Sequence, residues 1–89
     1  MEYLCTPSVQ NDKVVSVNIR ASETDGTNRV DTDQNWLIAE EDQKALSSWS
    51  QSDLDAVTAA ATTHYGWVAL LSAQLEVVRA KPKQDKFNF

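Results

Sequence analysis

The longest stretch of helix-compatible sequence runs from Gln51 to Ala80, where no proline occurs. A single helix over this range would be about 45 Å long at a rise of about 1.5 Å per residue. Its start is well marked, because Ser50 can cap the helix and Asp53 stands three residues later, as in a capping box. A chain of only 89 residues must arrange everything else around so long an element.

Apolar residues recur along this stretch with the heptad spacing of a helix-packing seam. The a positions are Leu54, Ala61, Val68 and Leu75, and the d positions are Val57, His64, Leu71 and Val78. An adjoining stripe consists of Ala60, Trp67, Leu70 and Val77. Together these stripes are wider than the roughly 100° apolar face of a simple surface helix. We therefore expect one face to pack on the rest of the chain and another to contact a partner.

Gly66 lies in the middle of this stretch and leaves more than one arrangement open. A glycine in a helix interior costs about 1 kcal/mol relative to alanine, and the seam keeps its phase across Gly66, so we favour one continuous helix. The alternative is a break at Gly66 that gives two shorter helices. It is also possible that both stripes form the protein's own core.

The N-terminal residues have the pattern of a β-hairpin. Every second residue from Val15 to Ala21 is apolar, which is typical of a half-buried strand. A short partner strand is expected over residues 3–6, with the turn at Asn11–Asp12. Pro7 cannot donate a ladder hydrogen bond, which places that partner strand at an edge of the sheet.

The middle of the chain is more polar. Residues 22–35 contain a turn signal at Asp25-Gly26, and Val30 can anchor a short returning strand. Residues 39–48 combine good helix formers with early acids and a late lysine, so we expect a short helix there.

The predicted fold class is therefore α+β. It comprises an N-terminal antiparallel β-hairpin or small sheet, one short helix, one long C-terminal helix and an extended basic and aromatic tail. We expect a single small domain over residues 1–80 and the tail over residues 81–89.

Small size limits how this fold can be stabilised, because small domains bury only roughly 60% of their unfolded surface. Cys5 is the only cysteine and His64 the only histidine, so an internal disulfide is excluded and a metal site is poorly supplied. Oligomerisation or a protein partner is the stabiliser that remains. The free cysteine and the lack of an export signal favour synthesis in a reducing cytoplasm, and no apolar run is long enough to cross a membrane.

The net charge of −5 is unevenly distributed. We interpret the acids in the middle of the chain as a solvated acidic surface that includes Asp31, Asp33, Glu40, Glu41 and Asp42. Residues 81–89 are basic instead, but they offer only a weak version of the basic face that direct nucleic-acid binding needs. We therefore expect no direct nucleic-acid contact.

No catalytic, metal or cofactor site is predicted. Asp25–Asn28 and Asp31–Asp33 lack the spacing of a calcium loop, and the acids at 40–42 suit a helix start better than acid–base catalysis. His64 at a seam position is either a pH-sensitive interface residue or, in the interpretation we prefer, a partly buried histidine with a hydrogen-bond partner.

Phe87 and Phe89 make the tail a candidate docking segment, because aromatic side chains are costly to leave in water. The tail can insert into a groove of a neighbouring subunit or fold back over its own chain. Together with the seam it gives the predicted partner-binding residues Val57, Ala61, Trp67, Val68, Leu71, Leu75, Phe87 and Phe89.

We expect a non-catalytic structural or assembly protein that packs in multiple copies. The composition resembles that of small proteins of tailed bacteriophages: short, acidic and tryptophan-containing. That resemblance implies a virion component. The alternative is an acidic inhibitor that binds a basic site of a host nucleic-acid-processing complex, with carboxylates in place of phosphates.

Overall fold

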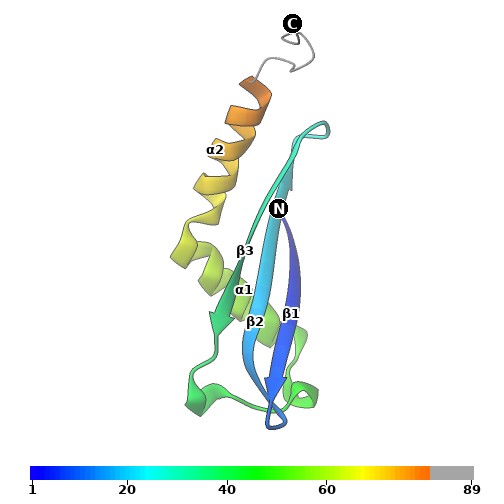
Figure 1. The fold of residues 1–89 in the computed structure, drawn as a ribbon, viewed down its shortest axis with the longest axis vertical. Coiled ribbons are helices and arrows are strands. Elements are labelled where there is room, and N and C mark those ends of the chain that lie inside the picture. The colour runs from blue at the N-terminus through cyan, green and yellow to red at the C-terminus, as the bar shows by residue number, and fades with distance from the viewer. Residues whose placement is uncertain (81–89) are drawn as a thin grey trace, which may run out of the picture.

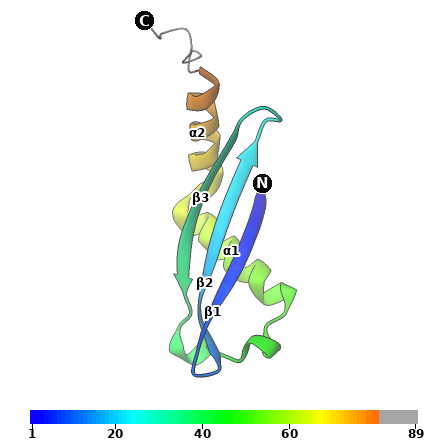
Figure 2. The same ribbon diagram turned by 45° about the vertical axis from the view of Figure 1, so that its right-hand side comes forward.

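The computed structural model of the protein describes residues 1–80, which form a three-stranded antiparallel sheet with two helices on one of its faces (Figures 1 and 2). The strands β1 (Glu2–Gln10), β2 (Lys13–Thr24) and β3 (Arg29–Leu37) are ordered β1-β2-β3. Two 3-10 turns, η1 (Glu40–Asp42) and η2 (Leu46–Ser48), lead to helices α1 (Gln51–Tyr65) and α2 (Trp67–Ala80). The predicted α+β class and N-terminal antiparallel sheet are confirmed.

The turn between β1 and β2 lies at Asn11 and Asp12, as predicted. Both residues have positive φ, 51° and 66°, which is the backbone that a two-residue hairpin favours because it matches the twist of the strands. β1 is longer than residues 3–6 and includes Pro7, which pairs with Val17. Since β1 is an edge strand, the missing N–H of Pro7 is tolerated there.

A β-bulge changes which valine of β2 faces the helices. Ser8 pairs with Ser16 and Val9 pairs with Val14, so that Val15 has no cross-strand partner in β1. Val14 is therefore fully buried, whereas Val15, which the simple alternation places inside, is only half-buried.

The short helix expected over residues 39–48 is replaced by η1 and η2. Between these turns the backbone is extended at Gln43 (φ −69°, ψ 133°), and the carbonyl of Lys44 accepts a hydrogen bond from the N–H of Val14. Pairing with the hairpin satisfies a backbone group that a continuous helix would leave unpaired.

The helical stretch is not continuous, so the arrangement we favoured from the sequence is wrong. Gly66 adopts the left-handed conformation (φ 63°, ψ 40°) and its N–H bonds to the carbonyls of Thr62 and Thr63, which ends α1. α1 packs against β1, whereas α2 runs beside β2 and β3 (Figures 1 and 2). The break thus lets the two helices take different directions over one sheet.

The core lies between this helix pair and the facing side of the sheet. Its fully buried members from β2 are Val14, Val17, Ile19 and Ala21, and those from the helices are Ala61, Trp67 and Leu71. The opposite side of the sheet carries polar residues, as where the Asn18 amide donates hydrogen bonds to Asp33 and Asn35 of β3.

Aromatic rings surround the joint between the helices. Tyr65 stacks on Trp67 with ring centroids 5.6 Å apart, and Trp36 of β3 meets the rings of His64 and Tyr65 edge-on at 5.7 and 6.3 Å. Such pairs add directional packing to the area they bury. Because Tyr65 and Trp67 stand on either side of Gly66, these ring contacts fix the end of α1 and the start of α2 beside β3.

Replacing Gly66 with alanine tests the break. Added Cβ atoms meet nothing within 4 Å, so the cost is that of a left-handed backbone, about 1–2 kcal/mol of unfolding free energy. Gly66→Asn should lose less, because asparagine tolerates this conformation better. Urea denaturation measures the free energy of unfolding of both variants. A Gly66→Ala protein more stable than wild type would contradict the break, because alanine stabilises a continuous helix.

Candidate functional site

α2 has apolar residues on two sides, and the sheet covers only one of them. Trp67, Leu71 and Leu75 face the sheet and are buried. On the other side is a set of exposed apolar residues that we call the outer face, made of Ala69, Leu70, Ala73, Val77 and Ala80. At about 100° per residue they fall on one strip of roughly 100°. Its two large members, Leu70 and Val77, are 39% and 58% exposed.

The predicted contact residues of the helix lie mostly in the core. Ala61, Leu71 and Leu75 of the heptad seam are buried and Val57 is half-buried, so most of the seam packs within the chain's own fold; Trp67 of the adjoining stripe is buried as well. Val68 alone is open to solvent, with 62% of its surface exposed. The exposed apolar surface belongs instead to the adjoining stripe through Leu70 and Val77. Phe87 and Phe89 lie outside the described residues.

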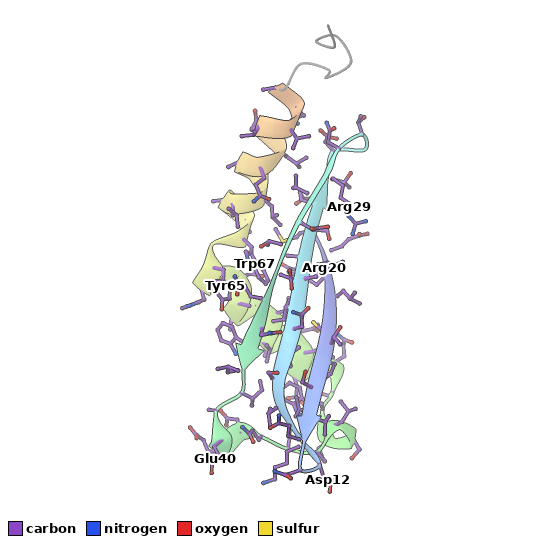
Figure 3. All side chains as sticks on the ribbon, in the orientation of Figure 1. Asp12, Arg20, Arg29, Glu40, Tyr65 and Trp67 are labelled. Atoms are coloured by element: carbon purple, nitrogen blue, oxygen red, sulfur yellow. The ribbon has the colours of Figure 1, made fainter. Side chains whose placement is uncertain are left out.

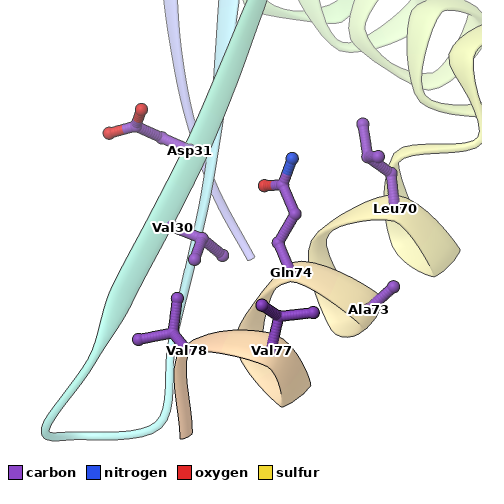
Figure 4. A pocket seen from close by; sticks show the side chains of 7 residues that line it. All are labelled: Val30, Asp31, Leu70, Ala73, Gln74, Val77 and Val78. Atoms are coloured by element: carbon purple, nitrogen blue, oxygen red, sulfur yellow. The ribbon is translucent and has the colours of Figure 1, made fainter. Parts of the chain in front are cut away.

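A groove of about 410 Å³ separates the outer face from β3. Its polar lining residues are Gln74 and Asp31, and Figure 4 shows the Asp31 carboxylate pointing away from α2. The rest of the lining is apolar and consists of Val30, Leu70, Ala73, Val77 and Val78. The groove can therefore accept an apolar side chain, and it offers no arrangement for catalysis.

The predicted acidic surface is divided into two groups. Asp31 and Asp33 lie on the open side of β3, opposite Ser22 and Arg20 of β2. Glu40, Glu41 and Asp42 form η1 and are all exposed. Figure 3 shows Glu40 at the same end of the molecule as Asp12, far from the end of α2. The two groups therefore do not make one acidic patch.

A second hollow, of about 700 Å³, lies beside η1. Its walls include Trp36 and Trp49, and Lys44 lies 5.6 Å above the Trp49 ring and 2.9 Å from the Asp53 carboxylate. Among the described residues, the indole N–H of Trp49 is the one buried side-chain polar group without a hydrogen-bond partner. The hollow was not predicted from the sequence, although all of its lining residues fall within residues 36–57.

The other candidate groups have structural roles. Asp25 accepts hydrogen bonds from the backbone N–H groups of Thr27 and Asn28, so it closes the β2–β3 turn. The Cys5 thiol lies 3.3 Å from the Thr58 hydroxyl.

Within residues 1–80, no group of three or more His, Cys, Asp or Glu side chains is placed where it could hold a metal ion. In the same range we find no helix long and apolar enough to cross a membrane.

Local hydrogen bonds lower the pKa of two carboxyl groups. The pKa of Asp53 is below its ordinary value chiefly because the Ser50 N–H donates to it, and Lys44 adds to the effect. The pKa of Asp25 is lowered first by the N–H of Asn28 and then by that of Thr27. Both groups therefore stabilise a turn or a helix start in their charged form.

These shifts predict a loss of stability in acid. A carboxyl group whose pKa is lower in the folded state stabilises the fold above its ordinary pKa of 3.8, and this contribution is lost as pH falls through the folded-state pKa. Asp53→Asn should therefore lower the free energy of unfolding at neutral pH. It should also make the fall of that free energy below pH 3.8 less steep. Urea denaturation across pH measures this, with Asp55→Asn as the control. Equal pH dependence in both variants would contradict the role of Asp53.

No protein-family model matches the chain, and no curated protein or solved structure matches it. The functional argument therefore starts from the surfaces described above. Of these, the groove beside the outer face has the most predominantly apolar lining.

Proposed function

We propose that this protein is a non-catalytic structural or assembly component that packs in multiple copies. One observation carries the proposal: the outer face of α2 is apolar and exposed although the other side of the same helix is already buried. Large contiguous apolar patches are rare on monomeric proteins and mark sites of interaction. A second copy that packs on the outer face would complete the burial of this helix.

The shape of the molecule supports the same conclusion. The radius of gyration is 17.0 Å and the principal extents are 57 × 24 × 19 Å. A compact chain of this length would have a radius of gyration of about 12 Å. So elongated a molecule has a thin core, and side-by-side packing of copies is a direct way to cover its sides.

The kind of assembly that we propose is a bacteriophage particle. The support is compositional, since the chain is short, acidic and tryptophan-containing like small proteins of tailed phages. The single cysteine suits synthesis in a reducing cytoplasm before incorporation. Co-sedimentation of the protein with purified particles would test this placement separately from self-association.

Two charges on the outer face should weaken self-association. Ala69→Glu/Ala73→Glu puts carboxylates where a second copy would exclude water, and unpaired buried charges are strongly unfavourable. We expect the dissociation constant for self-association to rise at least about tenfold, equivalent to about 1.4 kcal/mol. Sedimentation velocity over a concentration series measures this change.

The matched control is Val68→Glu/Ser72→Glu, which has the same charge and the same spacing on exposed positions of the same helix. Around the helix, Val68 lies about 100° and Ser72 about 60° from Ala69 at the edge of the outer face. The control should associate like wild type. If both variants associate like wild type, or if wild type stays monomeric at every concentration, the outer face is not a contact between copies.

A second candidate function is supported by the exposed acids of η1. Glu40, Glu41 and Asp42 are gathered at one end of the molecule, where they could occupy a basic site of another protein (Figure 3). We propose this acidic inhibitor as the alternative function. Replacing the three acids with lysine would remove such binding and leave self-association through α2 unchanged.

A further inference from the structure

The hollow beside η1 combines aromatic and acidic side chains, and its lining lies within residues 36–57, separate from α2. Its aromatic lining residues are Trp36 and Trp49. Its charged lining residues are three acids and one base: Glu41, Asp42, Asp53 and Lys44. A concave site of about 700 Å³ with a few polar groups among aromatic walls is of the size and kind that bind ligands. The excess of acids indicates that the ligand carries positive charge.

Lys44 shows which chemistry one wall of the hollow accepts. Its ammonium lies 5.6 Å from the centre of the Trp49 ring and 2.9 Å from the Asp53 carboxylate. The face of an indole and a carboxylate both attract a cation, the first through the ring quadrupole and the second through charge. The chain's own lysine therefore occupies this wall in the way that a cationic ligand would occupy the rest of the hollow.

The other two acids of the lining are available to a ligand. Within residues 1–80, Glu41 and Asp42 take part in no salt bridge, whereas Asp53 is paired with Lys44. Both side chains are exposed, and both come from η1. Trp36, at the end of β3, provides a second indole for the same hollow.

We propose that this hollow binds an arginine side chain from a basic segment of a partner protein. The guanidinium group is planar, so it can stack on an indole while it donates hydrogen bonds to a carboxylate of Glu41 or Asp42. The proposal rests on the second candidate function and makes it more specific. The acids of η1 would recognise a basic partner through an inserted side chain and not through net charge alone.

The indole N–H of Trp49 fits a ligand that also carries an acceptor. This N–H is buried without a hydrogen-bond partner among the described residues, whereas buried polar groups nearly always have one. Because no hydrogen bond within residues 1–80 fixes the ring, it can turn so that its N–H meets an acceptor in the hollow. An arginine residue within a peptide supplies both groups, since its side chain is cationic and its backbone carbonyl accepts.

NMR of the indole N–H groups tests the proposal, with N-acetyl-arginine-N-methylamide added to the chain of 89 residues. Trp67 is an internal reference, because it is 1% exposed and lies in the core. We expect saturable shifts of the Trp36 and Trp49 signals, a much smaller shift of the Trp67 signal, and no response to the uncharged citrulline analogue. Equal responses to arginine and citrulline, or no saturable shift, would overturn the proposal.

Matched charge variants separate the hollow from general attraction to an acidic protein. Glu41→Gln/Asp42→Asn should raise the dissociation constant of the arginine probe at least about fivefold, because two carboxylates of the lining are lost. Asp12→Asn/Asp55→Asn removes the same charge from exposed residues outside the lining and should bind like wild type. Asp12 lies at the same end of the molecule as η1 (Figure 3).

Equal weakening in both variants would mean that charge alone attracts the probe. That result would overturn the arginine site and leave the acidic inhibitor as a candidate function. Sedimentation measures self-association through α2, so the outer face and the hollow can each fail without the other.

Discussion

The placement of both helices depends on the left-handed backbone at Gly66. If residues 51–80 formed one straight helix, they would have only one direction, whereas the strands of a twisted sheet differ in direction. The break allows α1 to pack on β1 while α2 follows β2 and β3, and the stacked Tyr65 and Trp67 rings hold the joint from both sides. Once α2 is fixed in this way, Trp67, Leu71 and Leu75 reach the sheet. The outer face is then left without a covering layer, and this consequence links the fold to the proposed function.

Local signals in the sequence predicted the local features well. Period-2 apolar residues predicted β2, Asn11 and Asp12 predicted the hairpin turn, and the Ser50–Asp53 capping box predicted where α1 begins. Each of these depends on a few neighbouring residues whose backbone preference does not need the rest of the fold. The α+β class follows from them, because a strand pair and a helical stretch in this order leave few other arrangements.

Features that depend on tertiary contacts were not predictable in the same way. β3 is longer than the expected strand because Asp31, Asp33 and Asn35 face the open side of the sheet, where polar residues are stable but give no apolar pattern. The candidate site shows the same limit. The sequence identified the right helix and both apolar stripes, but periodicity alone does not say which stripe the sheet covers. For most of the seam the outcome was the reverse of the one preferred: Ala61, Leu71 and Leu75 are core. Val68 of the seam is exposed, as are Leu70 and Val77 of the other stripe, whereas Trp67 of that stripe is buried.

The central claim is that α2 is packed on one side only and that another copy covers the other side. Amide hydrogen exchange as a function of protein concentration tests it most directly, because local opening of a helix slows when a partner binds its exposed face. The account predicts that protection of residues 67–80 rises with concentration while that of β2 stays constant. Equal protection of α2 at all concentrations would contradict the claim.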